Sequence, residues 1–328
     1  MYTFWSRHPW LRRCIFGMLA FLVVVISALL ALAYLYMPPE ERTETPTYLT
    51  YLQARHLDGY VDAGDFRLHY LHEGKGAPVV LLPGNGAWIY SFRDIVPTLA
   101  QHYSVYAIDT PGDGYTTPLL PHPDYATLYT LTPIDQSILA FLDHFHPGRV
   151  AIGGNSEGGG IALSFAEHYP ERVSKYLSLD GTGLNIPDSW FWQLTAAPVI
   201  GEVYTKLTIS RDAMRQILSA VTVHLQVTDA VVENYYIPYT FHLNVVSWWV
   251  MECRIHWEET EQQLAQMNIP ILVIWGKQDT VLDPQLYLPR WRHVAPQATI
   301  VEIDQAGYAV QEDQPEQVSQ TLLHFLAS

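Results

Sequence analysis

Ala151-Ile-Gly-Gly-Asn-Ser-Glu-Gly-Gly-Gly160 is the stretch that decides the fold, because it holds Ser156 in the pattern G-x-S-x-G between Gly154 and Gly158. The apolar run 149–153 is typical of a buried strand, and residues 161–168 have helical character. Small residues on both sides of the serine allow a sharp strand-to-helix turn, on which the hydroxyl projects towards the reacting centre and the helix N-terminus faces it. The sequence therefore predicts a nucleophilic serine at position 156.

The alternative interpretation of this stretch is a glycine-rich connection with an incidental serine. The order strand, turn, helix favours the nucleophile. A nucleotide-binding loop is excluded, because neither G-x-x-x-x-G-K-[ST] nor G-x-G-x-x-G fits these residues.

Strand and helix patterns alternate through most of the chain, which predicts an α/β fold with a mainly parallel sheet and helices on both faces. A half-exposed strand is expected at 66–72. Buried strands are expected at 78–82, 104–108, 149–153, 173–179, 271–275 and 299–303, and helices at 91–100, 133–144, 284–294 and 315–326. Residues 184–265 have helical patterns and no buried strand, so they look inserted. We expect an N-terminal segment at 1–37, a linker at 38–57 and a folded body at 58–328.

Residues 14–37 contain no charged side chain, and as a helix they are long enough to cross a hydrocarbon core of ~30 Å. Three arginines precede this run and two glutamates follow it, so the positive-inside rule places the N-terminus in the cytoplasm and the body outside. The expected partner is the lipid bilayer. Cleavage near Ala33, which would give a secreted body, and a buried helix of the soluble domain are the alternatives.

The charge balance argues against binding to nucleic acid. The chain of 328 residues has a formal net charge of −15, and residues 38–328 hold 15 basic against 33 acidic residues, or −18. Such a body repels polyanions and anionic lipid headgroups. Cys14 and Cys253 lie far apart, and no Cys/His cluster has zinc-ligand spacing, so we expect no disulfide, metal or cofactor.

Four motifs in order make the chain resemble the α/β-hydrolase fold family from about residue 59 onwards. They are Leu81-Leu-Pro-Gly-Asn-Gly86, Ala107-Ile-Asp-Thr-Pro-Gly-Asp-Gly-Tyr-Thr116, the serine turn, and Trp275-Gly-Lys-Gln-Asp279. The resemblance implies that Ser156 is the nucleophile, that the backbone N–H groups of Asn85 and Glu157 form the oxyanion hole, and that Asp279 is the acid. Asp180, after the strand 173–179, is the alternative acid. The insert at 184–265 is then a helical cap.

The departure from the family pattern is at the catalytic base. Residues 302–316 match the segment that carries the family's histidine, and Tyr308 stands at the histidine position. A phenol with a reference pKa near ~10 is protonated at neutral pH and cannot shuttle a proton as an imidazole with a pKa of ~6.5 does. We therefore expect weakened general-base catalysis.

Two groups of side chains keep two interpretations each. The other histidines are expected to be surface or packing residues, although a histidine of the insert could reach Ser156. The aromatic residues of the insert either line a pocket or pack the cap on the body; they are Trp190, Phe191, Trp192, Tyr235, Tyr236, Tyr239, Phe241, Trp248 and Trp249. The side chain of Glu157 is expected to point away from the site.

The sequence thus predicts a membrane-anchored serine hydrolase, esterase- or lipase-like, that acts on a small acyl substrate without a cofactor. The alternative is a lapsed hydrolase that serves as a binding or interaction module. Hydrolases with an aspartate nucleophile are disfavoured because position 156 is serine, whereas serine-dependent perhydrolases and C–C bond hydrolases remain open.

Overall fold

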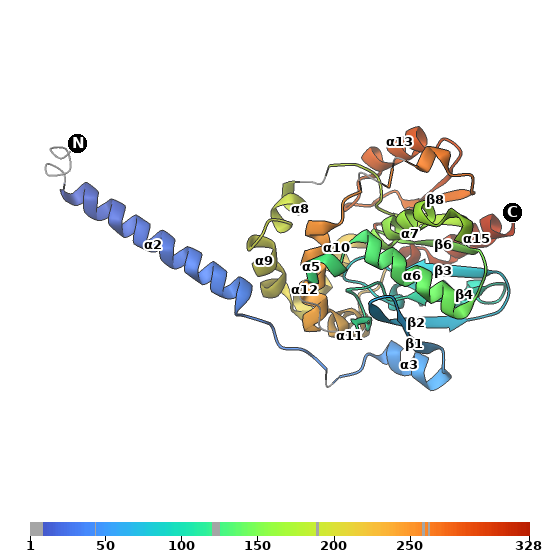
Figure 1. Ribbon diagram of the computed structural model, residues 1–328, viewed down its shortest axis with the longest axis horizontal. Helices are drawn as coiled ribbons and strands as arrows, with labels where there is room; N and C mark the ends of the chain where they lie inside the picture. Colours follow the sequence, from blue (N-terminus) through green and yellow to red (C-terminus); the bar gives the residue numbers. More distant parts are fainter. Residues whose placement is uncertain (1–8, 43, 120–124, 188–189, 258–259, 262) are drawn as a thin grey trace.

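A nine-stranded sheet forms the centre of the body in the part of the chain that the computed structural model describes, residues 9–42, 44–119, 125–187, 190–257, 260–261 and 263–328 (Figure 1). Its strands are β1 (Asp58–Ala63), β2 (Phe66–Glu73), β3 (Pro78–Leu82), β4 (Ser104–Ile108), β5 (Thr117–Pro118), β6 (Val150–Asn155), β7 (Val173–Leu179), β8 (Ile271–Gly276) and β9 (Thr299–Ile303). The order is β1-β2-β4-β3-β6-β7-β8-β9, with β5 on β2. From β4 to β9 all neighbours are parallel, whereas β2 pairs antiparallel with β1, β4 and β5. The expected mainly parallel sheet is confirmed.

The helices of the body are α3 (Thr47–Arg55), α4 (Val96–Leu99), α5 (Tyr125–Leu128), α6 (Leu131–Phe145), α7 (Glu157–His168), α13 (Pro284–Val294), α14 (Val310–Asp313) and α15 (Pro315–Ala327). Between β7 and β8 lie α8 (Trp190–Thr195), α9 (Ile200–Thr208), α10 (Arg211–Val221), α11 (Asp229–Tyr239) and α12 (His242–Arg254). The described residues of this insert contain no strand.

Alternate residues of the central strands face two separate cores, as the period of two in a strand requires. Val80 and Ile152 pack with residues of α6, α7 and α13 in one core. Val79 and Leu81 pack with residues of α3, α4 and α15 in the other. Helices therefore cover both faces of the sheet, which explains why the strands read as continuous apolar runs.

Two expected elements differ in detail. The helix expected at 91–100 is instead a 3₁₀ turn, Ile89–Phe92, followed by the short α4. Pro97 lies in the first turn of α4, where a residue without an N–H is tolerated, so it starts a new helix instead of continuing the earlier one. The stretch expected as a linker contains α3, which is ordered because Leu49 and Leu52 are buried on the body.

The N-terminal helix α2 (Pro9–Tyr34) extends away from the body (Figure 1). Residues 10–34 are long and apolar enough to cross a membrane; an 18-residue part of this stretch has a mean hydropathy of 2.9, and none of that part is buried in the body. Residues 1–8, including Arg7 of the predicted cytoplasmic segment, lie outside the described residues. The C-terminal end of α2 contacts α9, and Ala33 is fully buried there.

Candidate active site

Ser156 lies at the turn between β6 and α7, with φ 52° and ψ −123°. This is a sparsely populated backbone conformation for a residue with a side chain, so the turn stores strain. Gly154 and Gly158 make it feasible. A Cβ on either glycine would lie 2.2 Å from the carbonyl oxygen of Leu82, so only glycine lets β3, β6 and α7 approach so closely.

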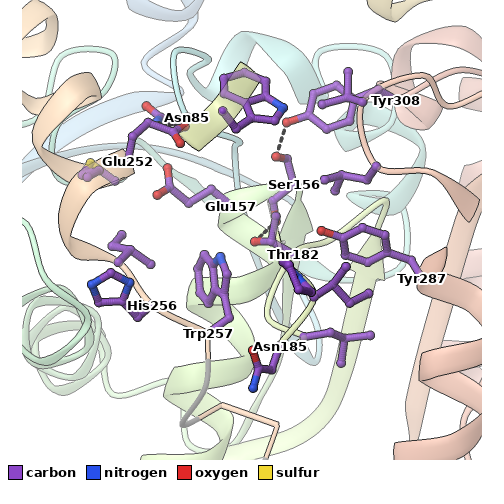
Figure 2. Close-up of a pocket in the computed structure, with 18 of the residues that line it drawn as sticks. Asn85, Ser156, Glu157, Thr182, Asn185, Glu252, His256, Trp257, Tyr287 and Tyr308 are labelled. Carbon is purple, nitrogen blue, oxygen red and sulfur yellow. Dashed lines mark hydrogen bonds between the residues drawn. The ribbon is translucent and has the colours of Figure 1, made fainter. Parts of the chain in front are cut away.

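The phenol of Tyr308 donates a hydrogen bond to Oγ of Ser156 (Figure 2). Asn155 fixes this arrangement, since its Nδ2 donates to the carbonyl oxygens of Leu179 at 2.9 Å and of Tyr308 at 3.0 Å. Burial, with smaller effects of nearby carboxylates that include Asp279, raises the pKa of Tyr308, and the hydrogen bond to Ser156 opposes the rise. The phenol is therefore neutral and acts as a donor to the serine.

Asp279 lies close enough to Asp180 for its charge to raise the pKa of Asp180, and it also acts on Tyr308. Oδ1 of Asp279 accepts N–H bonds from Val281 at 2.7 Å and Leu282 at 2.9 Å, whereas its buried Oδ2 has no partner among the described residues. Burial raises the pKa of Asp279 to about 7, although the two N–H bonds lower it. A free, buried oxygen at this point is what an imidazole N–H would need as acceptor.

Asp180 is fully buried, and both of its carboxylate oxygens accept backbone N–H groups. They come from Gly276 at 2.7 Å and Val310 at 3.3 Å, so the side chain ties the end of β8 to the start of α14. Burial, followed by the charge of Asp279, raises the pKa of Asp180 well above its usual range. These bonds leave Asp180 less free than Asp279 to orient a base.

The predicted oxyanion donors lie on the other side of Ser156. Glu157 is the first residue of α7, so its N–H has no acceptor within the helix. The turn that carries Asn85 packs against the serine, because a Cβ on Gly84 would lie 3.0 Å from Cβ of Ser156. Asp113 holds this turn by accepting the N–H of Gly86 at 2.7 Å.

Ser156 opens into a cavity of about 250 Å³. Its wall is shared by the body and the insert, and it contains Asn85, Ser156, Glu157, Thr182, Leu184, Asn185, Ile186, Pro187, Trp192, Trp248, Met251, Glu252, Ile255, His256, Trp257, Val281, Leu282, Tyr287 and Tyr308. Among the described residues no cluster of three or more His, Cys, Asp or Glu could hold a metal ion. The space suits a small molecule placed against the serine hydroxyl.

The expectation that the side chain of Glu157 points away from the site is wrong. The side chain lines the cavity and extends towards Glu252 of α12 (Figure 2). It is 8% exposed, and burial, followed by the charges of Glu252 and Asp113, raises its pKa well above the usual range. The sequence alone did not reveal this direction.

Glu252 is the other polar residue that the sequence analysis missed. Nδ2 of Asn85 donates to its Oε1 at 3.3 Å, so α12 is linked to the turn after β3. Glu252 follows the apolar run Trp248–Met251, and an isolated acid in such a run was the only available signal.

The sequence left open that a histidine of the insert reaches Ser156. His256 lines the cavity, but in the described part of the chain no hydrogen bond joins it to Ser156. His69 is fully buried in the core, where its Nδ1 lies 2.7 Å from Oδ2 of Asp109. His242 contacts the carbonyl of Pro38 at 2.8 Å. Apart from His256, these histidines are packing or linking residues.

Both interpretations of the aromatic residues of the insert apply, to different members. Trp192 and Trp248 line the cavity. Tyr235 and Tyr236 of α11 are buried in the core that also contains Val79 and Leu81, whereas Trp190 is 76% exposed. The side chain of Phe191 lies outside what the structure describes.

Comparison with known proteins identifies the fold. A family model described as alpha/beta hydrolase fold matches residues 77–205. A cis-3-alkyl-4-alkyloxetan-2-one decarboxylase of Shewanella oneidensis is 27% identical over 281 residues, covering 79% of this chain and 85% of that protein. The solved structure of a serine hydrolase involved in carbazole degradation is 24% identical, with a TM-score of 0.68 over 82% of this chain and 98% of that one. A membrane phospholipase A, 20% identical, matches 96% of this chain and 98% of its own with a TM-score of 0.70.

Proposed function

We propose that this chain, which is an α/β-hydrolase-fold protein, is a membrane-anchored serine hydrolase that acts on an ester-like or other small acyl substrate. The observation that carries the proposal is the place of Ser156, on a strained strand-to-helix turn with its hydroxyl in a cavity. Oγ of Ser156 would attack the acyl carbonyl, the leaving group would depart with a proton, and water would then cleave the acyl-enzyme.

The supporting groups are assigned by their positions. The N–H groups of Glu157 and Asn85 would hold the oxyanion, each contributing about 10²- to 10³-fold. Asp279 is the proposed acid, because its Oδ2 is free for a base. Asp180 remains the alternative acid, disfavoured by its two backbone bonds.

Tyr308 limits the expected rate. Its neutral phenol donates to Ser156, so it occupies a lone pair of Oγ instead of removing the proton. Without a base, an enzyme of this type retains roughly 10³- to 10⁴-fold over water from the oxyanion hole and from binding. The proposed hydrolase is therefore slow.

Helices α8–α12 form the proposed cap. They lie between β7 and β8 in the chain, and α8 and α12 contribute Trp192, Trp248 and Glu252 to the cavity of Ser156. With about 250 Å³, the cavity is slightly smaller than typical ligand pockets of about 300–1,000 Å³, so a small acyl or alcohol group is expected.

Helix α2 is the proposed membrane anchor, with the N-terminus in the cytoplasm and the body outside. Lys206 of α9 is 4% exposed and donates to the carbonyl oxygen of Ala33 at the end of α2, where the helix dipole favours a cation. The likeness to a membrane phospholipase A extends over 96% of the chain and adds support. Cleavage near Ala33 is the alternative, and it would remove this contact.

The test is labelling of the full chain with a fluorophosphonate probe, together with turnover of p-nitrophenyl acetate. Parent, Ser156→Ala and Tyr308→His are compared. We expect slow, Ser156-dependent labelling in the parent and at least a ~10²-fold faster turnover in Tyr308→His, since general-base catalysis is worth about 10²- to 10⁴-fold.

The second candidate is a lapsed hydrolase that binds a ligand, and it is favoured by the presence of Tyr308 at the base position. Turnover that occurs only in Tyr308→His would support this candidate. No labelling of either protein would contradict the assignment of Ser156, and no gain in Tyr308→His would contradict the assignment of position 308.

A further inference from the structure

The wall of the cavity beside Ser156 combines two carboxyl groups with several aromatic rings. Glu157 comes from the start of α7 and Glu252 from α12, and Figure 2 shows both on the same side of Ser156, next to Asn85. No lysine or arginine is among the described residues that line the cavity, and His256 is its one weakly basic member.

Two acceptor atoms at this wall are buried and have no partner among the described residues. They are Oε2 of Glu157, whose side chain is more than nine-tenths buried, and Oδ1 of Asn85. A buried acceptor without a hydrogen bond costs about 1–3 kcal/mol, and more if it is charged. A positively charged hydrogen-bond donor would satisfy both of these acceptors.

The aromatic residues favour the same kind of group. Trp192, Trp248, Trp257 and Tyr287 line the cavity, and the faces of such rings attract organic cations. The surrounding body has a net charge of −18 outside residues 1–37, so its field also concentrates cations near the opening.

We propose that the cavity binds a small molecule that carries an ammonium group, which lies between the carboxyl groups of Glu157 and Glu252, with its reactive acyl group at Ser156. The proposal rests on the proposed function only for this last point. Binding of the ammonium group requires no turnover, so it can be tested even if Ser156 is inactive.

The ionisation of Glu157 gives the binding a pH dependence. Burial, followed by the charges of Glu252 on α12 and Asp113 after β4, raises the pKa of its carboxyl well above the usual range, which favours the protonated form. His256 and Tyr308 also line the cavity that it faces. A bound cation stabilises the carboxylate, so binding releases a proton. The affinity for an ammonium ion should therefore rise with pH up to the pKa of Glu157.

The binding test uses butylammonium and 1-butanol, which have the same heavy-atom skeleton and differ in charge. Calorimetric titration of the full chain in a non-ionic detergent should give at least a ~10-fold tighter binding of butylammonium, and butanoate should not bind. Glu157→Gln and Glu252→Gln should each reduce the preference ~5-fold or more, whereas Glu316→Gln on the exposed face of α15 should leave it unchanged.

A second arm measures turnover with the p-nitrophenyl esters of β-alanine and of butanoic acid, which again differ only in the ammonium group. Preference for the β-alanine ester supports the proposal, and its loss in Glu252→Gln supports the role of that residue. Equal binding of butylammonium and 1-butanol, tighter binding of butanoate, or a preference that neither glutamine variant changes would overturn the proposal. Binding of butylammonium without turnover of either ester would sustain it and contradict the proposed function alone.

Discussion

At the scale of single residues, the contact between Tyr308 and Ser156 sets the chemistry of the site. A histidine at this position would accept the serine proton on one ring nitrogen and donate a hydrogen bond from the other to Asp279. Tyrosine can do neither, so the serine keeps its proton and Oδ2 of Asp279 keeps no partner in the described structure. If Asp279 is the acid, as we propose, it is retained without the imidazole that it would orient.

The isolated acid should lower stability as the pH rises. The pKa of Asp279 is raised to about 7 in the folded state from an unfolded value of ~3.9, so the folded state binds the proton more tightly. This contribution to stability is present below pH ~4 and is lost as the pH rises to about 7. Asp279→Asn keeps an oxygen for the N–H groups of Val281 and Leu282 and removes the charge.

We expect Asp279→Asn to stabilise the protein by on the order of 2 kcal/mol at pH 8 and by much less at pH 4, because one pKa unit corresponds to about 1.4 kcal/mol. Thermal unfolding across this pH range measures the difference. Asp65→Asn, in the exposed turn between β1 and β2, is the matched control. An equal effect of Asp279→Asn on stability at both pH values would contradict the raised pKa of Asp279 in the folded state.

At the scale of elements, the junction of β6 and α7 is the part that sequence predicts best. Glycine is required at 154 and 158 because β3, β6 and α7 approach one another closely at Leu82. The sequence motif is therefore sufficient to predict this local geometry. The placement of Tyr308 beside Ser156 follows from the same parallel order of strands. Strand and helix order, and hence the α/β fold, were predictable for this reason.

The contacts of α12 were not predictable in this way. Glu252 reaches the cavity because the insert packs on the body through side chains, and helix packing has no register comparable to that of strands. The direction of the Glu157 side chain depends on the same packing. Helix α3 was missed because only Leu49 and Leu52 form its apolar side.

The strain at the junction gives opposite predictions for two substitutions. Ser156→Gly and Ser156→Ala both remove the acceptor of the Tyr308 hydroxyl, so their comparison isolates the backbone. Relative to Ser156→Ala, Ser156→Gly relieves about 1–3 kcal/mol of backbone strain and costs about 0.5–1 kcal/mol in flexibility, so it should be more stable by roughly 1 kcal/mol. Gly158→Ala should destabilise by about 1–3 kcal/mol or more, because its Cβ would meet two carbonyl oxygens at 2.2 and 2.3 Å.

Thermal unfolding of both variants tests this pair of expectations. Gly148→Ala separates the two causes of instability, since Gly148 has a positive φ of 78° and no atom within 4 Å of its Cβ position. If Gly158→Ala lost no more stability than Gly148→Ala, the result would contradict the close packing of α7 on β3. A lower stability of Ser156→Gly than of Ser156→Ala would contradict the strained turn.

At the scale of the whole molecule, α2 and the insert form one side of the protein. Figure 1 shows α8 and α9 on the side of the body that faces the end of α2. Large apolar side chains are exposed there, namely Trp190, Leu194, Ile200, Tyr204 and Leu207. Such a surface beside a membrane span would lie in the lipid interface, where tryptophan and tyrosine are favoured. The proposed cap would then connect the membrane with the cavity, because Trp192 of α8 lines it.

This arrangement predicts two levels of membrane attachment. The full chain should remain in the membrane fraction after carbonate extraction, because a helix of this hydropathy inserts essentially irreversibly.

Residues 38–328 alone should still bind weakly to phosphatidylcholine vesicles through α8 and α9. They should bind less to phosphatidylglycerol vesicles, which repel a body of charge −18. Leu194→Ser with Leu207→Ser should reduce vesicle sedimentation of this fragment at least ~5-fold, whereas Leu286→Ser, equally exposed on α13, should not. Mass spectrometry of the N-terminus of the membrane-derived protein completes the test, because a soluble chain that begins near residue 34 would establish a cleaved signal sequence in place of the anchor. Sedimentation that is unaffected by the substitutions on α8 and α9 would place another face of the body on the bilayer.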